Sequence, residues 1–158
     1  MKHLLPALLL LFFSQLAQAD QSHASARRFM DEWVDSFNGN DAKKISAFYE
    51  VDERVEMLGS NGLTLKGHEK IAESYRNDMK AVRFYDSKSQ EMRIRVFDKT
   101  ALASFIHRFR YEILGDGRHC EVHIRTTTTL RQTELGWKIV LEHSSAIQGI
   151  ERVKFLED

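Results

Sequence analysis

The sequence has one cysteine and one proline among 158 residues, and it has no excess of charge of either sign. Because Cys120 has no second thiol to pair with, an intramolecular disulfide is excluded. We predict a small apolar strand residue there, with a reactive thiol or an intermolecular bridge as the alternatives. The 23 basic residues balance the 23 acidic ones, so neither a nucleic acid nor an anionic membrane is expected as a partner.

The first 19 residues are predicted to be a secretory signal peptide. Lys2-His3 precedes an apolar run over 4–13, and Ala17-Gln18-Ala19 forms a small-x-small cleavage site. The run is too short and wrongly flanked for a permanent membrane span. We therefore expect cleavage after Ala19, no membrane anchor afterwards, and a periplasmic or secreted protein.

The rest of the sequence lacks Pro/Gly/Ser-rich linkers, repeats and low-complexity tracts, and it is long enough for one domain with one core. We predict a domain over 20–146 and a C-terminal tail over 147–158. The tail is either an edge strand or a helix docked on a neighbour.

Three helices are expected in the first half of this domain. Phe29, Trp33 and Phe37 recur at four-residue spacing, which predicts an amphipathic helix over 22–38. Asp41 is placed to cap a second, shorter helix over 42–49. A third helix begins after Gly67, with Ile71, Tyr75 and Met79 on its apolar stripe.

Strands follow the helices and dominate the second half. Asn61-Gly62 predicts a hairpin between 54–58 and 63–66. Alternating segments over 83–98, 101–112 and within 120–146 predict long strands joined by short turns. The fold class is therefore α+β, with helices packed on one face of an antiparallel sheet. In the last strand, alternation puts Trp137, Ile139, Leu141, His143 and Ser145 on one face.

Motifs for cofactors and metals are missing. Nucleophilic triads, Gly-rich phosphate loops and dinucleotide fingerprints do not occur. His119, Glu121 and His123 share one strand face, but Cys120 lies on the other and no second cluster supplies a matching pair. We therefore expect no metal and no cofactor.

The order of elements and several motifs resemble the SnoaL-like domains of the nuclear transport factor 2-like superfamily. The most specific part is Gly136-Trp137-Lys138-Ile139-Val140 with His143 and Ser145. Supporting parts are Phe48-Tyr49 with Asp52, Gly67-His68-Glu69 with Ile71, and Arg125-Thr126-Thr127. The strand ending is also similar to the association domain of calcium/calmodulin-dependent kinase. The resemblance implies a cone-shaped α+β fold, in which a curved sheet wraps the helices around a deep pocket, and homodimers formed through the sheet.

This superfamily contains both enzymes and non-enzymes, so fold alone does not give function. An ungapped comparison with ketosteroid isomerases places the general base at Met57, the oxyanion tyrosine near Trp33 and the protonated aspartate near Thr128. None of these side chains can supply the same acid or base. Steroid isomerase chemistry is therefore disfavoured. The one alternative is a slip of one residue in the comparison, which would bring Glu56 into the base position.

Six polar residues are expected to point into the cone. Arg125 matters most among them for the kind of ligand that the cone would bind. A partly desolvated guanidinium favours a bound carboxylate, but an ion pair with Glu121 or Glu142, or projection into solvent, would satisfy it equally. His143 is an acid/base group or a hydrogen-bond donor to a ligand, or else a histidine held by Ser145 or a backbone carbonyl. The remaining members are His107, a candidate core histidine or base, and the wall residues Tyr49, Tyr75 and Tyr111.

These residues support three hypotheses. The favoured one is a non-catalytic module that binds a small amphipathic or carboxylate-bearing ligand, with Arg125 as anchor and Trp33, Phe105 and Tyr111 as walls. The second is an isomerase, cyclase or dehydratase with His143 or His107 as base and Tyr111 or Arg125 polarising a carbonyl. The third is an oligomerisation or interaction module that uses the sheet or the tail over 147–158.

Overall fold

The computed structural model describes the backbone of residues 4–156 and the side chains of residues 20–156. Its helices are α1 (Leu4–Ser36), the short 3-10 helix η1 (Phe37–Gly39), α2 (Ala42–Ser46) and α3 (His68–Ala81). Its strands are β1 (Glu56–Leu58), β2 (Thr64–Lys66), β3 (Val82–Phe97), β4 (Thr100–Ile113), β5 (His119–Thr133), β6 (Gly136–Ala146) and β7 (Val153–Phe155). The predicted order of elements is confirmed.

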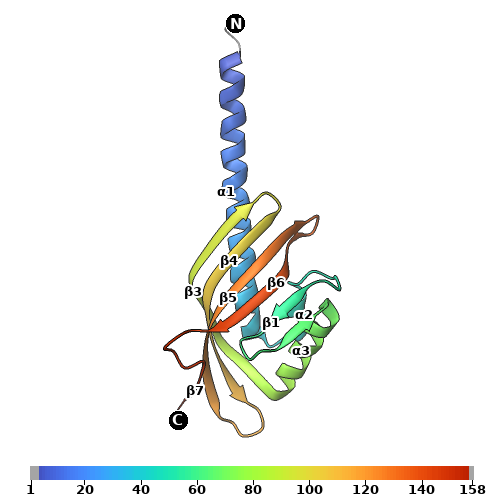
Figure 1. The fold of residues 1–158 in the computed structure, drawn as a ribbon, viewed down its shortest axis with the longest axis vertical. Helices are drawn as coiled ribbons and strands as arrows, with labels where there is room; N and C mark the ends of the chain where they lie inside the picture. The colour runs from blue at the N-terminus through green and yellow to red at the C-terminus, as the bar shows by residue number, and fades with distance from the viewer. Residues whose placement is uncertain (1–3, 157–158) are drawn as a thin grey trace.

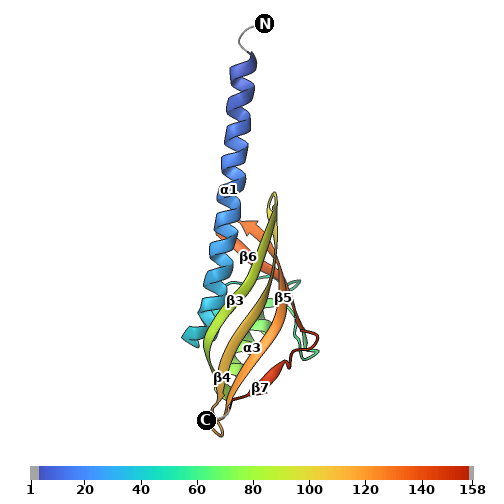
Figure 2. The same ribbon diagram turned by 90° about the vertical axis from the view of Figure 1, so that its left-hand side faces the viewer.

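The strands form one curved sheet in the order β2-β1-β6-β5-β4-β3, and β7 pairs with β5 beyond the end of β6. The helices pack on one side of this sheet (Figures 1 and 2). The α+β class with helices on one face is therefore confirmed. One pairing departs from the antiparallel rule, because β1 runs parallel to β6. In the tail, β7 is a short edge strand, and residues 147–156 contain no helix.

The second half of α1 lies against the sheet, and its first half projects beyond it (Figures 1 and 2). The packed part carries the predicted apolar stripe: Met30 and Trp33 are buried, and so is Phe37 in the adjoining η1. The helical backbone begins at Leu4 and therefore includes part of the predicted signal peptide. None of the helices in the described residues is long and apolar enough to cross a membrane.

Asp41 caps α2 as predicted, since its carboxylate accepts the backbone N–H groups of Lys43 and Lys44 at 3.0 and 3.2 Å. The helix ends at Ser46, three residues earlier than expected. The chain leaves the helix there because Tyr49 forms a parallel bridge with Ile139 of β6. This bridge places the Tyr49 side chain in the interior of the cone.

A β-bulge in β6 changes which side chains reach that interior. Leu130 of β5 pairs with Ile139, but its neighbour Thr129 pairs with Leu141, so Val140 is an extra residue on β6. The alternation predicted for Trp137 to Ser145 is therefore wrong after Ile139. The buried residues of β6 are Trp137, Ile139, Glu142 and Ser144.

Candidate functional site

Five polar side chains form one buried chain of hydrogen bonds inside the cone. Tyr49 donates its hydroxyl proton to Glu142 Oε2, and Tyr75 lies 2.7 Å from the Tyr49 oxygen. On the other side, Ser144 donates to Glu142 Oε1 at 3.2 Å, and Thr126 lies 3.1 Å from the Ser144 oxygen. Because the protons of Tyr49 and Ser144 are used on the carboxylate, Tyr75 and Thr126 must donate to them. All four hydroxyl protons then point toward Glu142.

The carboxyl at the centre of this network is almost fully buried, with 7% of its surface exposed. Burial raises the pKa of Glu142, while the hydrogen bonds from Tyr49 and Ser144 oppose that rise. Burial and the negative charge of Glu142 also raise the pKa of Tyr49. The site therefore holds a carboxyl that is more easily protonated than an exposed glutamate, beside phenols that keep their protons.

Separate elements bring these residues together. Tyr49 follows α2, Tyr75 lies on α3, Thr126 on β5, and Glu142 and Ser144 on β6 after the bulge. Phe37 links this network to α1, since its ring contacts Tyr75 at 5.8 Å and Trp33 at 5.4 Å between centroids. The interior is thus a continuous aromatic region with one buried carboxyl.

Trp33 adds an unusual donor to this interior. Its side chain is fully buried, and its indole Nε1–H has no hydrogen-bond partner within the described residues. An unsatisfied buried donor costs about 1–3 kcal/mol. A ligand with a carbonyl or hydroxyl oxygen would satisfy it.

His107 is a satisfied core histidine. Ser87 donates its hydroxyl proton to the Val34 carbonyl at 2.7 Å, so His107 Nε2–H must be the donor in its 2.9 Å contact with the Ser87 oxygen. Burial lowers the pKa of His107 to about 3. The imidazole is therefore neutral near pH 7, and one of the two predicted bases does not titrate there.

Arg125 and His143 do not point into the cone. Both are exposed and lie on the outer face of the sheet, opposite to the buried Thr126 and Glu142. The expectation for His143 fails because of the bulge at Val140. Arg125 simply alternates with its buried neighbour on β5.

The proposed ion pairs of Arg125 are not formed. Glu121 instead accepts hydrogen bonds from Arg108 at 2.7 Å and Arg110 at 2.8 Å, and these bonds lower its pKa to about 2. Glu142 lies on the opposite face. Of the three alternatives considered for Arg125, projection into solvent describes its position.

The other predicted wall residues lie on the inner side. Trp33, Tyr49 and Tyr75 are buried, and the half-buried Tyr111 packs its ring against Phe84 at 6.3 Å between centroids. Burial and the neighbouring Cys120 thiol raise the pKa of Tyr111 to about 12. Cys120 itself is buried, as predicted for a strand residue.

The positions compared with ketosteroid isomerases also lie inside. Met57, Trp33 and Thr128 are buried, and Thr128 Oγ1 lies 3.5 Å from the Met30 sulfur. Glu56 alternates with Met57 and faces outward, where it pairs with Lys66 at 3.8 Å. The one-residue slip that would make Glu56 a base therefore does not occur.

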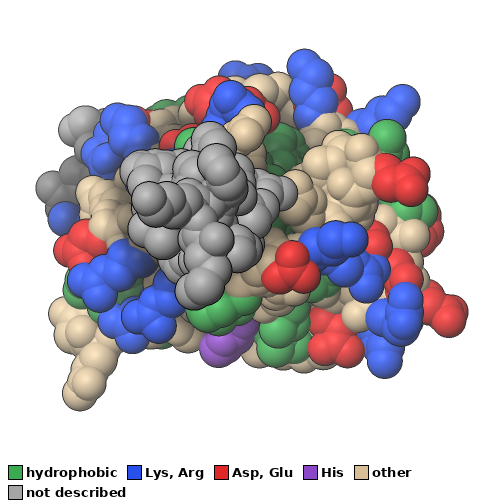
Figure 3. All heavy atoms as spheres, turned by 90° about the horizontal axis from the view of Figure 1, so that it is seen from above, with side chains coloured by type: hydrophobic (Ala, Val, Ile, Leu, Met, Phe, Trp, Pro, Cys, Tyr) green, Lys and Arg blue, Asp and Glu red, His purple; other side chains and the backbone are tan. Residues whose placement is uncertain are grey.

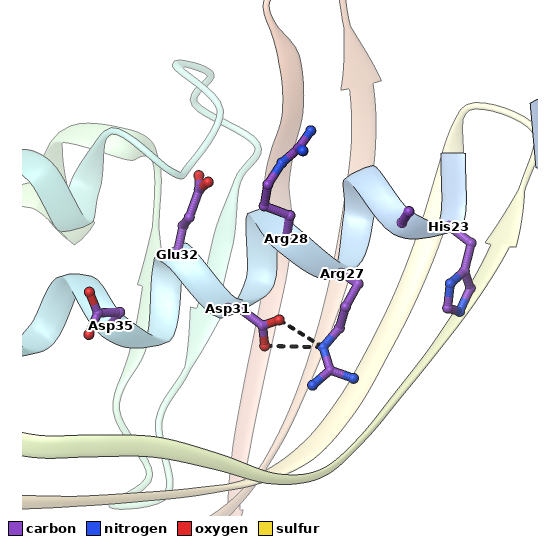
Figure 4. A pocket seen from close by; sticks show the side chains of 7 residues that line it. His23, Arg27, Arg28, Asp31, Glu32 and Asp35 are labelled. Atoms are coloured by element: carbon purple, nitrogen blue, oxygen red, sulfur yellow. Dashed lines mark hydrogen bonds and ion pairs between the residues drawn. The ribbon is translucent and has the colours of Figure 1, made fainter. Parts of the chain in front are cut away.

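Among the residues with described side chains, four of the surface grooves are open to solvent, and the buried network lines none of these four. The largest of the four, about 520 Å³, is bordered only by residues of α1, which Figure 4 shows pointing in different directions. Arg27 and Asp31 pair across it. On the face in Figure 3, basic and acidic side chains are interspersed. A groove with one wall and mixed charge is a poor ligand site.

Several solved structures share this fold. A proposed dehydratase of the nuclear transport factor 2-like family from Streptomyces avermitilis superimposes with a TM-score of 0.73, at 16% identity over 82% of this chain and 99% of that one. A nuclear transport factor 2-like protein from Salmonella enterica gives 0.69, at 19% identity over 83% and 96%. A proposed calcium/calmodulin-dependent protein kinase II association domain from Xanthomonas campestris gives 0.65, at 16% identity over 79% and 87%. The fold is therefore nuclear transport factor 2-like.

A sequence match assigns the chain to one family with this fold. Residues 26–149 match the family model of the SnoaL-like domain, so the chain belongs to the SnoaL-like family. The search of curated proteins gives no match.

Proposed function

We propose that this domain binds a small, uncharged amphipathic molecule inside its cone without transforming it. The buried Tyr75–Tyr49–Glu142 chain carries the proposal. Burying a carboxyl is costly, and well-packed apolar residues in its place are often neutral or stabilising. Stability alone therefore does not account for Glu142, whereas binding a polar group would.

The chemistry of the interior favours an uncharged ligand. A carboxylate-bearing ligand would be repelled by Glu142 when that group is ionised, and Arg125, the expected anchor, lies on the outer face. A carbonyl or hydroxyl group can instead accept a hydrogen bond from the Trp33 N–H, which has no partner among the described residues. Aromatic rings around Phe37 would surround the apolar part of the ligand.

Binding is expected to displace packed side chains, because the network is buried and lines none of the four grooves described above. The expected ligand is therefore small, and its affinity is reduced by the free energy needed to open the interior. Substitutions that lower the free energy needed to open the interior should strengthen binding.

A panel of uncharged amphipathic molecules, each with a matching carboxylic acid, tests the proposal by thermal shift and native mass spectrometry. We expect uncharged members to raise the melting temperature of the native protein and of Arg125→Ala. Tyr49→Phe should lose most of that shift. A shift that survives Tyr49→Phe but disappears in Arg125→Ala would place the ligand outside the cone and refute the proposal.

The raised pKa of Glu142 favours one second candidate, an enzyme that transfers protons. A buried carboxyl with a raised pKa, held by two hydroxyl donors, can act as general acid or base. It would replace His143 and His107 in that role, because one is exposed and the other stays neutral. Turnover that depends on pH and is abolished by Glu142→Gln, but not by His143→Ala, would establish this function.

Two further expectations remain proposals. We propose that residues 1–19 direct export, which N-terminal sequencing of the protein from periplasm or medium tests by a mature end at Asp20. We also propose a homodimer through the outer face of the sheet, supported by the family resemblance and by Leu102, which is 41% exposed there. Light scattering of the native protein and of Leu102→Glu tests it, since only the native protein should be dimeric.

A further inference from the structure

The outer face of the sheet has a groove of about 270 Å³ outside the cone. It is lined by Glu91 and Arg93 of β3, Ser104, Phe105 and Ile106 of β4, and Arg125 of β5. Phe105 points to the core and is buried, so it contributes only backbone to the groove. The side chains at the surface are two arginines, one serine, one isoleucine and one glutamate.

Strand register explains why the two arginines share this groove. Arg93 pairs with Ser104, and Arg125 pairs with Ile106, two residues further along the same central strand. Two strand spacings and a two-residue offset separate their Cα atoms by roughly 12 Å. Side chains as long as arginine can therefore converge over β4 from both sides, with the Ser104 hydroxyl between them.

The groove exists because β3 is irregular at this point. The β3–β4 register shifts between Gln90 and Arg93, and Glu91 adopts a left-handed backbone conformation with φ of 54°. A residue other than glycine is rarely found in this conformation. Bulges of this kind redirect side chains and are enriched beside functional sites. Here the bulge turns Glu91 and Arg93 toward the groove.

The two guanidinium groups also lack partners. In the part of the chain with described side chains, neither Arg93 nor Arg125 forms an ion pair, whereas Arg108, Arg110 and Arg131 on the same face each hold a carboxylate. Glu91 lines the groove but lies too far from both for an ion pair. Two free arginines and a hydroxyl are the donors that bind an oxyanion bidentately.

We propose that this groove is a second binding site, which takes the carboxylate or phosphate group of a small anion. Arg93 and Arg125 hold the oxyanion from opposite sides, and Ser104 donates a hydrogen bond. Ile106 contacts the apolar part of the ligand. The site is independent of the buried network, so either proposal can fail without the other. It shares the outer face of the sheet with the proposed homodimer, because Leu102 lies two residues from Ser104 on β4. Anion binding should therefore compete with dimer formation and shift the protein toward the monomer.

NMR titration of the native protein with inorganic phosphate and with succinate tests this site and distinguishes the two anions. We expect saturable shifts of the Ser104 amide and of the Arg93 and Arg125 side-chain signals, reduced by added NaCl. Because the pairs are exposed, removing either arginine should weaken binding roughly fivefold. Glu91→Gln should strengthen binding, since it removes a negative charge that borders the groove and repels the anion.

Arg95→Ala is the matched control, because Arg95 is also an exposed arginine of β3 and lies outside the groove. It should bind both anions as the native protein does. All these residues are exposed, so the variants should fold, and their melting temperatures check this. Equal weakening in Arg95→Ala, or no shift with either anion, would overturn the proposal. Shifts that track only a change of oligomeric state in light scattering would also overturn it.

Discussion

Glu142 and His143 are consecutive in the chain and lie on opposite faces of the sheet. The bulge at Val140 turns Glu142 into the cone, where Tyr49 and Ser144 donate hydrogen bonds to its carboxylate, and turns His143 to solvent. Simple alternation from Trp137 predicts the reverse. The interior of the protein therefore contains a carboxyl group at this point of β6 and not an imidazole.

Alanine substitutions at these two positions should therefore differ strongly. Glu142→Ala leaves the Tyr49 and Ser144 hydroxyls without an acceptor and should cost about 1–3 kcal/mol of unfolding free energy. His143→Ala, at an exposed position, should stay within about 0.5 kcal/mol of the native protein. Urea denaturation of both variants measures this. If His143→Ala were the more damaging change, the face assignment would be wrong.

The stability of the protein should fall as pH rises, through Glu142. The pKa of this carboxyl is raised in the folded state, so folding favours its protonated form. Its contribution is present below the pKa of the unfolded chain and is lost as pH rises through the folded pKa. The side chain of Glu142→Gln stays neutral. The free energy of unfolding of this variant, relative to that of the native protein, should therefore increase from pH 4 to pH 8, by at most about 1.4 kcal/mol per pH unit.

Chemical denaturation across that pH range provides the measurement. Glu56→Gln is the matched control, because Glu56 is a glutamate on the outer face of β1. Its pH dependence should follow that of the native protein. A Glu142→Gln variant with the native pH dependence would show that the buried carboxyl does not titrate in this range.

His107 should produce the opposite slope at acid pH. Burial lowers its folded pKa from 6.5 to about 3. The stability it contributes is therefore present above about 6.5 and is lost as pH falls toward 3, with a limiting slope of about 1.4 kcal/mol per pH unit. His107→Phe keeps an aromatic ring in place and should flatten the loss between pH 7 and 5. His143→Ala, which removes an exposed histidine, should leave that loss unchanged.

The two tryptophans should respond differently to replacement by phenylalanine. Both are buried, but Trp137 Nε1 donates to the Ser25 hydroxyl at 2.9 Å and Trp33 Nε1 has no partner among the described residues. Each change costs packing, and only Trp137→Phe also loses a hydrogen bond. Trp33→Phe removes an unsatisfied donor, which should offset about 1–3 kcal/mol of its packing loss.

Thermal and urea unfolding of both variants compare the two sites. We expect Trp137→Phe to be the less stable variant. Equal losses would mean that Trp33 has an acceptor, such as a water molecule, in solution. In that event the indole would offer no free donor to a ligand.

The sequence determined the fold, because the signals for its elements are local. Four-residue spacing of Phe29, Trp33 and Phe37 sets the apolar stripe that runs along α1 into η1, and Asp41 caps α2 through its nearest backbone N–H groups. Asn61-Gly62 sets the β1–β2 turn. The motif that contains Trp137 and His143 predicted a SnoaL-like domain, and the match to the family model confirms this prediction. Each of these signals depends on a few adjacent residues.

The site depends on contacts between distant parts of the chain. The inward positions of Trp33, Tyr49, Tyr75 and His107 followed from periodicity, but Glu142 did not, because a bulge depends on how Val140 pairs with neighbouring strands. That pairing involves β5, β1 and the bridge at Tyr49, which are far apart in the chain. One extra residue reverses every later side chain of a strand. The same physics moved His143 to the surface and brought a carboxyl into the core.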